Sequence, residues 1–463
     1  SQAVQAYANQ IQQSLNPETG LLMRAVLMTG LSTGNKLLVV VHHLVVDGVS
    51  WRILLADLER LFTQHLKGKM LSLSNKTSSY QQWANFLSEF SKSPALLAEK
   101  RFWQGVLEKG ADTFSAVATS ENSMPAGTGE VNIELDKTLT KQLLNQSHKS
   151  YRTKINELLL AGLLLAVYRS WDKTSLRLDL EGHGREVLTE RLDLSQTVGW
   201  FTSLYPVFLH LEKDPSKEQE GDLIKAIICN VKEQYRAIPN NGIGFGVLKY
   251  LAKEPEFADF SGSELVFNYL GQLDQFISKD IHFAIANESP GENVSRARAS
   301  SHKLMLNGMV IEESLKFSLS YDPRRCDKGE LQKFLTQYQR ALADIVSHCL
   351  TNKGGLTPSD FELASVDQSM LDAWQANRDI EDLYPATGMQ QGLLFHSMKE
   401  SGSYVTQTIL SFDDLNLECF ERAWQFIVGR HSVFRTAFVG WESGNAHQLV
   451  QPSVKLPWQV KDL

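Results

Sequence analysis

The chain has 463 residues, of which 43% are hydrophobic and 21% charged, fractions typical of globular proteins. Its 46 Lys and Arg against 53 Asp and Glu give a net charge of −7, which argues against general nucleic-acid binding because phosphate recognition needs a basic excess. Cys229, Cys326, Cys349 and Cys419 lie far apart in the sequence, so we expect reduced thiols rather than a zinc site or a disulfide framework.

The N-terminal part of the chain alternates between helical and strand patterns. A helical spacing of apolar residues opens it, and Leu- and Val-rich segments at residues 21–28 and 36–41 predict two strands. The second strand leads into His42 and His43, and helices are expected over residues 50–66, 80–90 and 96–107.

A polar, turn-forming stretch from about residue 122 to 129 predicts a boundary between two sub-domains. Beyond it, strand patterns occur at residues 131–135, 176–180, 204–211, 264–269 and 315–320. Helical patterns occupy residues 155–171 and 328–349, and the first of these is too short to span a bilayer. The whole pattern predicts a mixed α/β fold.

The C-terminal part differs in composition. Residues 351–382 are rich in turn-forming and acidic residues, which predicts a linker with a short helix near residues 370–374. A second globular pattern follows, with a strand expected at residues 405–412 and a helix at 417–430.

The first chemical signal is the string HHLVVDGVSW at residues 42–51. A histidine pair at the end of a strand can aim one imidazole into a cleft, where it gives or takes a proton near neutral pH. Asp47 precedes a helix, where a carboxylate commonly caps backbone N–H groups or forms a salt bridge. A histidine beside the core is more often structural than catalytic, so this string alone leaves both interpretations open.

The second signal is EGHGRE at residues 181–186, directly after a predicted strand. Glu181 stands there beside glycines that let backbone approach a ligand closely, although a solvated polar loop is an equal alternative for this string alone. Three further strings follow in order: TVGWFTSLYP at residues 197–206, PNNGIGFG at 239–246 and FNYLGQ at 267–272. The glycine-rich string is no dinucleotide fingerprint, because no strand–helix unit frames it.

Taken in this order, the five strings resemble the motifs of nonribosomal peptide synthetase epimerization domains, a branch of the condensation-domain superfamily. The resemblance extends over about residues 15–350, and EGHGRE matches the epimerization motif without a mismatch. It implies an α/β, chloramphenicol-acetyltransferase-like two-lobed fold, a V-shaped pair of sub-domains with a central cleft. The motif that opens such domains does not precede the first string, so we expect an incomplete N-terminal lobe.

Two later strings, LYPATGMQQGLLFHS at residues 383–397 and RHSVFRTAF at 430–438, resemble the first two motifs of a condensation domain. The expected organisation is therefore a partial N-terminal lobe at residues 1–125, a C-terminal lobe at 126–350, a linker at 351–382 and the N-terminal segment of a following condensation domain at 383–463.

The resemblance implies L-to-D epimerization of the α-carbon of an aminoacyl or peptidyl thioester, carried on the phosphopantetheine arm of a carrier protein. It assigns the two proton transfers to His43 and Glu181, without deciding which of them deprotonates the L-substrate. It points to Asn268 and Tyr269 for orienting the thioester or stabilising its enolate. The remaining motif residues, expected to be structural, are His42, Asp47, Gly48, Trp51 and Arg185.

No metal and no organic cofactor is expected in this domain, because the thioester itself stabilises the carbanion. The expected partners are a peptidyl carrier (thiolation) domain and neighbouring adenylation and condensation domains, with no nucleic acid and no membrane, in the cytoplasm. Two alternatives remain open: a peptide-bond-forming condensation domain that uses His43, and a non-catalytic fragment that only docks carrier protein. The full Glu181 motif and FNYLGQ weigh against the former.

Overall fold

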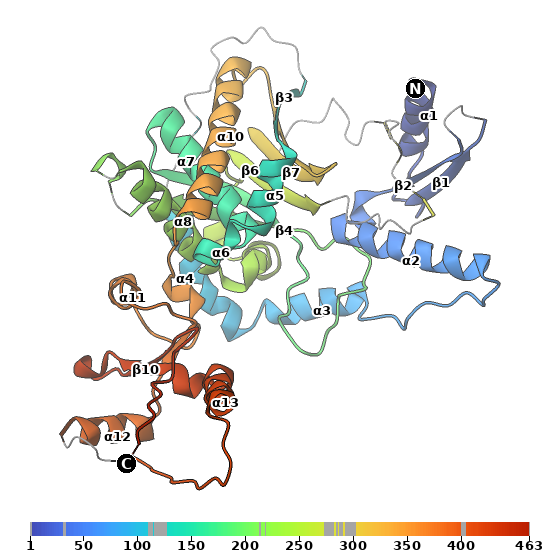
Figure 1. Cartoon of the computed structure of the whole chain (residues 1–463). Coiled ribbons are helices and arrows are strands. Elements are labelled where there is room, and N and C mark those ends of the chain that lie inside the picture. Colours follow the sequence, from blue (N-terminus) through green and yellow to red (C-terminus); the bar gives the residue numbers. More distant parts are fainter. Residues whose placement is uncertain are drawn as a thin grey trace. The chain divides into compact units, whose positions relative to one another are not determined.

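The computed structural model describes residues 2–30, 34–109, 114, 127–212, 214–217, 219–272, 282–283, 286, 290–291, 302–399 and 404–462 (Figure 1). The chain divides into two compact units. The first comprises Ser1–His148 and Thr153–Thr351, and the second comprises Lys149–Arg152 and Asn352–Leu463. Each is described separately below.

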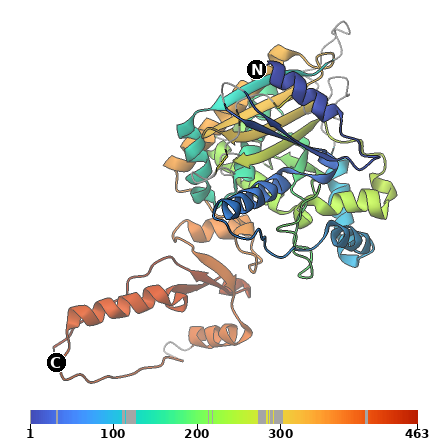
Figure 2. The same ribbon diagram turned by 90° about the vertical axis from the view of Figure 1, so that its right-hand side faces the viewer.

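The first unit begins with a helix, α1 (Gln2–Gln13), which lies beside an antiparallel hairpin of β1 (Met23–Met28) and β2 (Lys36–Val41) (Figure 2). Three helices follow the hairpin, and each begins after a residue whose side chain accepts a hydrogen bond from the first turn: Asp47, Ser79 and Ser93. Such caps satisfy N–H groups that have no partner inside the helix. The helices are α2 (Gly48–Leu66), α3 (Tyr80–Phe90) and α4 (Pro94–Glu108).

A six-stranded mixed sheet forms the centre of the first unit, with strand order β3-β8-β7-β6-β4-β5. Strand β6 pairs in parallel with β4 and β7, and the other neighbours are antiparallel. The strands are β3 (Gly129–Leu135), β4 (Ser175–Gly182), β5 (Ser203–His210), β6 (Leu265–Gln272), β7 (Leu304–Ile311) and β8 (Ser314–Tyr321). The sub-domain boundary expected near residues 122–129 falls largely on residues 122–126, outside the described residues.

Helices pack against this sheet, and α7 is the most deeply buried of them. Its residues 158–167 are buried, and the α-carbon of Gly162 lies so close to α10 that a Cβ there would meet Leu342 at 2.6 Å. Glu157, which interrupts the apolar run, is buried and accepts a hydrogen bond of 2.8 Å from Arg236. The helices are α5 (Lys137–Asn145), α7 (Ile155–Trp171), α8 (Glu220–Arg236), α9 (Ile243–Gly246), which continues into a π-helical turn, η5 (Val247–Ala252), and α10 (Lys328–Thr351). The short helix α6 (His148–Tyr151) starts at the last residue of one segment of the first unit, and its other residues belong to the second unit.

Strand β4 separates two kinds of side chain onto its two faces. Leu176, Leu178 and Leu180 are buried on one face, and α7 packs against this strand. Because side chains alternate along a strand, Asp179 and Glu181 share the opposite face. Glu181, the first residue of the second motif, therefore lies on the face of β4 opposite the buried leucines.

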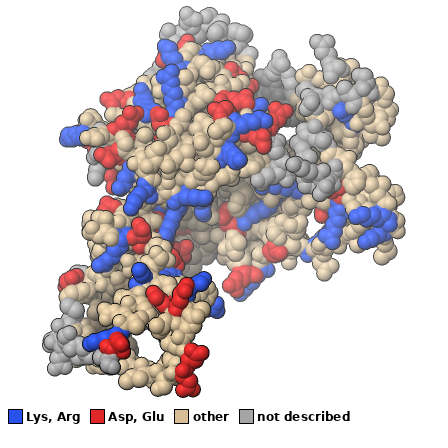
Figure 3. Space-filling model, in the orientation of Figure 1, with Lys and Arg blue, Asp and Glu red and all other residues tan. Residues whose placement is uncertain are grey.

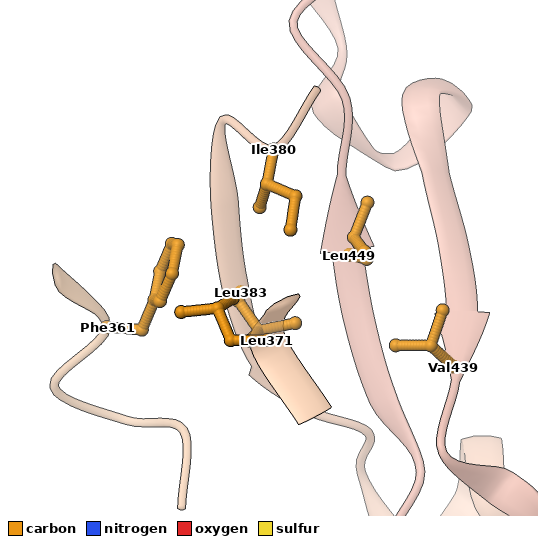
Figure 4. Packing of buried hydrophobic residues seen from close by; sticks show 6 residues of the cluster. All are labelled: Phe361, Leu371, Ile380, Leu383, Val439 and Leu449. Atoms are coloured by element: carbon orange, nitrogen blue, oxygen red, sulfur yellow. The ribbon is translucent and has the colours of Figure 1, made fainter. Parts of the chain in front are cut away.

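The second unit is built on a three-stranded antiparallel sheet of order β10-β11-β9. Its core gathers six buried side chains, shown in Figure 4: Phe361, Leu371, Ile380, Leu383, Val439 and Leu449. The elements are α11 (Gln368–Gln375), β9 (Asp382–Pro385), α12 (Gly388–Lys399), α13 (Leu417–Arg430), β10 (Thr436–Val439) and β11 (His447–Val450).

Two features of this unit differ from the sequence-based expectations. A linker was expected at residues 351–382, but all of these except Thr351 belong to the second compact unit, and Phe361 and Leu371 are buried in its core. The strand expected at residues 405–412 is wrong. The segment has no ladder partner within the described residues and its Ile409 is 96% exposed, so its β propensity has no sheet to join.

The visible surface carries both signs of charge. Lys and Arg side chains are interspersed with Asp and Glu over the face shown in Figure 3. In the part of the chain that the structure describes, no helix is both long and apolar enough to cross a membrane.

Candidate active site

His42 and His43 lie just beyond the end of β2 and occupy different environments. The ring Nδ1 of His42 accepts a hydrogen bond of 3.2 Å from the Leu44 N–H and so closes the turn that follows the strand. His43 is exposed, and its ring meets the Trp200 ring edge-on with 5.7 Å between centroids. The turn therefore leaves the second histidine of the pair exposed to solvent.

Asp47 joins the first motif to the second. Its carboxylate caps α2 through the Ser50 N–H at 2.8 Å, and it accepts two hydrogen bonds from the Arg185 guanidinium, at 2.6 and 3.0 Å. The Phe201 N–H adds a further bond of 3.0 Å. Burial raises the pKa of Asp47, but these donors outweigh burial and hold the pKa below its usual value.

Arg185 extends the same network to the third motif. It donates to the Ser50 hydroxyl at 3.0 Å and to the Thr197 carbonyl at 3.2 Å, and its guanidinium lies 4.0 Å from the centroid of the Phe201 ring. The side chains of Asp47 and Arg185 are only 4% and 6% exposed. This contact bridges the start of α2 and the loop after β4.

Glu181 stands near the carboxyl end of β4, beside Asn268 on β6. The two strands pair in parallel with Leu180 opposite Phe267, so the next residues are neighbours, and Asn268 Nδ2 donates to Glu181 Oε2 at 2.7 Å. Burial raises the pKa of Glu181, while the nearby charges of His43 and His302 lower it by less, so that the pKa lies above its usual value. Glu181 is nevertheless exposed by its surface area, so burial raises the pKa of a carboxyl group that solvent still reaches.

Tyr269 is not drawn into this hydrogen-bonded group. No hydrogen bond links it to His43 or Glu181 within the residues described, and a break in strand register follows it. Burial raises the pKa of its phenol to about 12, so the hydroxyl keeps its proton at neutral pH. Gly48 is the exposed first residue of α2, and Trp51 is half-buried in its first turn.

The structure adds a buried polar cluster that the sequence did not single out. The carboxylate of Asp179, 2% exposed, accepts bonds from the Ser263 hydroxyl at 2.7 Å and the Ser263 N–H at 3.1 Å. It also lies 2.9 Å from His302 Nε2. The sequence did carry a signal for Asp179, because it is an acidic residue inside an apolar strand, two positions before Glu181. His302 could not be found in this way, because the strand that follows it was not predicted.

The glycine-rich string at residues 239–246 forms a 3-10 turn followed by the short helix α9. Asn240 donates to Glu99 Oε1, and Asn241 donates to Glu186 Oε2, each at 2.6 Å. Among the described residues, no group of three or more His, Cys, Asp or Glu could hold a metal ion. No disulfide joins the four cysteines.

A family model of the Condensation domain matches residues 1–364 and 380–463. The chain belongs to the condensation-domain family. This confirms the resemblance of its motifs to the nonribosomal peptide synthetase domains, and the α/β, chloramphenicol-acetyltransferase-like two-lobed fold expected from that resemblance is also confirmed.

The relatives of this condensation-family chain include much longer proteins. A linear gramicidin synthase protein of Brevibacillus parabrevis is 41% identical over 98% of this chain and 6% of its own length. Bacitracin synthase 3 of Bacillus licheniformis is 36% identical over 94% of this chain and 7% of its own length. The chain thus spans less than a tenth of either relative.

Solved structures give a similar result. The epimerization domain from the third module of tyrocidine synthetase B is 31% identical, with a TM-score of 0.67 over 76% of this chain and 77% of that one. The condensation domain of the monacolin K polyketide synthase, 16% identical with a TM-score of 0.55 over 74% of this chain and 77% of that one, shares the fold.

Proposed function

We propose that this chain epimerizes the α-carbon of an aminoacyl or peptidyl thioester carried on the phosphopantetheine arm of a carrier protein. The observation that carries the proposal is the placement of Glu181 beside Asn268, within electrostatic reach of His43. Similarity to an epimerization domain at 31% identity supports it.

Epimerization needs two proton carriers at one carbon. One group breaks the Cα–H bond by accepting the proton, the electron pair moves into a thioester enolate, and a second group returns a proton on the opposite face. His43 and Glu181 fill these roles in our proposal. The raised pKa of Glu181 favours proton exchange near neutral pH, since a catalytic group works best when its pKa approaches the working pH.

The enolate oxygen needs hydrogen-bond donors where its charge develops. Asn268 lies next to Glu181 on the neighbouring strand, and we assign its amide to orienting the carboxylate and the thioester. Tyr269, which keeps its phenolic proton, is a second candidate donor for the oxyanion. The proposed chemistry uses no metal and no cofactor beyond the substrate's own phosphopantetheine.

Peptide-bond formation is the principal rival, because the matched family model is that of the Condensation domain. Such a reaction would use His43 but gives no role to a carboxylate at position 181. A chain that only docks carrier protein would show neither activity. The two reactions leave different products, so measuring Cα exchange, amide formation and carrier-protein binding together separates the three possibilities.

The test is deuterium uptake at Cα of a carrier-bound aminoacyl thioester in heavy water, followed by mass spectrometry. We expect uptake by the parent chain and a loss of about 10²- to 10⁴-fold in Glu181→Gln, the usual contribution of a general acid or base. The matched control is Glu190→Gln, which makes the same change at an exposed residue and should keep the parent rate.

Two outcomes would reject the proposal. One is amide formation with a second aminoacyl carrier protein and no Cα exchange, which would favour condensation. The other is binding of carrier protein by a cooperatively folded chain that catalyses neither reaction.

A further inference from the structure

A cavity of about 550 Å³ lies in the first unit, between α3, the start of β5, the α9–η5 segment and the loop before β6. Its volume falls within the roughly 300–1,000 Å³ of typical small-molecule pockets. Aromatic side chains supply much of its wall: Tyr80, Trp83, Trp200, Phe245, Tyr250 and Phe260.

His43 and Glu181 do not line this cavity, but residues of its wall neighbour both groups. Trp200 is part of its wall and contacts the His43 ring. Asp179 and His302 are also in the wall; Asp179 shares a face of β4 with Glu181, and the charge of His302 acts on the Glu181 carboxyl. A ligand reacting between His43 and Glu181 can therefore extend into the cavity.

The charged side chains of the wall are engaged within the protein, whereas the uncharged Ser203 hydroxyl is buried in the wall without a hydrogen-bond partner among the described residues. Asp179 accepts three hydrogen bonds from Ser263 and His302. The Lys249 ammonium donates to the Phe260 carbonyl, and the Tyr80 hydroxyl donates to the Trp200 carbonyl at 2.8 Å. Because burying an unpaired charge is costly, this wall suits an uncharged ligand group.

Only one part of the proposed substrate matches that chemistry. The α-carbon carries the thioester carbon, a nitrogen and the amino-acid side chain; the first two are polar and need hydrogen-bond partners. We propose that the cavity receives the side chain of the thioester-bound amino acid and selects an uncharged, apolar or aromatic one. The inference rests on the proposed function, since it takes the reacting carbon to lie between His43 and Glu181.

Binding tests the inference without turnover. The probes are aminoacyl-pantetheine analogues in which an amide replaces the thioester, with phenylalanyl, alanyl, lysyl or glutamyl groups, and the dissociation constants are measured by calorimetry. We expect the phenylalanyl analogue to bind at least about tenfold more tightly than the alanyl one, since even one methylene in an apolar pocket is worth about tenfold or more. The two charged analogues should bind most weakly.

Gly246 offers a way to fill the cavity. It lines the wall, has helical backbone angles, and an added Cβ would meet nothing within 4 Å. Gly246→Phe should abolish the phenylalanyl preference and retain alanyl binding. The matched control is Gly221→Phe, at a helical glycine with equal open space outside the cavity wall, and it should keep the parent preference.

Tyr250→Ala removes one aromatic wall at a residue that is 66% exposed and therefore tolerant of change; it should weaken phenylalanyl binding about tenfold. Equal binding of the phenylalanyl, alanyl and charged analogues by the parent chain would overturn the inference, as would unaltered selectivity in both cavity variants. Failure of Cα exchange with this selectivity intact would reject the proposed reaction and leave the pocket assignment standing.

Discussion

At the scale of single residues, two opposing effects act on the pKa of Glu181. Burial raises the pKa of its carboxyl group, and the charges of His43 and His302 lower it by less. For the substrate enantiomer from which Glu181 takes the proton, the carboxylate must be deprotonated, so the rate of Cα exchange should rise with pH through this raised pKa. The folded chain holds the proton on Glu181 more tightly than the unfolded chain does. The resulting contribution to the free energy of unfolding is therefore fully present below the pKa that Glu181 has in the unfolded chain. It is lost as pH rises through the folded pKa.

His302→Gln tests this balance. Glutamine can still donate to Asp179 but carries no charge, so the pKa of Glu181 should rise further. For the substrate enantiomer that Glu181 deprotonates, the acidic limb of the pH profile of Cα exchange should then move to higher pH, with the rate at high pH preserved. His183→Gln, at a histidine that is 57% exposed, is the control. A limb that stays in place or moves to lower pH would contradict the assigned effect of His302.

At the scale of elements, the start of α2 and the loop after β4 depend on the same ion pair. Asp47 caps the helix and also binds Arg185, 138 residues away. The loop backbone fits only because Gly184 has φ +67, and a Cβ there would lie 1.6 Å from the Phe201 carbonyl oxygen. Glycine accepts this conformation without strain. These contacts give the physical reason why the EGHGRE motif needs its second glycine, Gly184, and its arginine, Arg185.

Arg185→Met should lower the free energy of unfolding by about 3–5 kcal/mol, because it leaves the buried Asp47 charge without its partner. The double variant with Asp47→Asn should lose less than the sum of the single changes, since the two residues are in direct contact. Urea denaturation of the parent chain, the two single variants and the double variant measures the free energy of interaction between Asp47 and Arg185. Arg324→Met breaks an exposed ion pair and should change stability little. Additive losses from Asp47 and Arg185 would show that their contact is not stabilising.

At the scale of the whole molecule, the chain forms two compact units with separate hydrophobic cores. Leu449→Ala should destabilise the second unit by about 2–5 kcal/mol, because its side chain is fully buried in the core cluster (Figure 4). Hydrogen exchange with mass spectrometry should show faster exchange in residues 352–462 and little change in the first unit.

Leu363→Ala, at a residue of the same unit that is 75% exposed, is the control and should leave the exchange pattern unchanged. Faster exchange spread equally over both units would mean that they unfold as one.

Many elements could be predicted because their signals are local. The apolar spacing predicted α7 over residues 155–171, as observed, and the helix at 417–430 and the strand at 36–41 also match. Helix α8 and strand β7 were not predicted. The strand predicted at 405–412 does not form, because a strand also requires a neighbour to receive its backbone hydrogen bonds.

The sequence by itself determined the family and the α/β class, because motif strings and hydrophobic periodicity lie within short stretches of chain. From the same motifs it predicted His43 and Glu181 as the proton carriers. Only the tertiary structure decided that Glu181 binds Asn268, that His302 meets Asp179 across 123 residues, and that aromatic side chains enclose a cavity beside them. These contacts depend on strand order and on packing between distant segments, and no local pattern encodes which distant residues will meet.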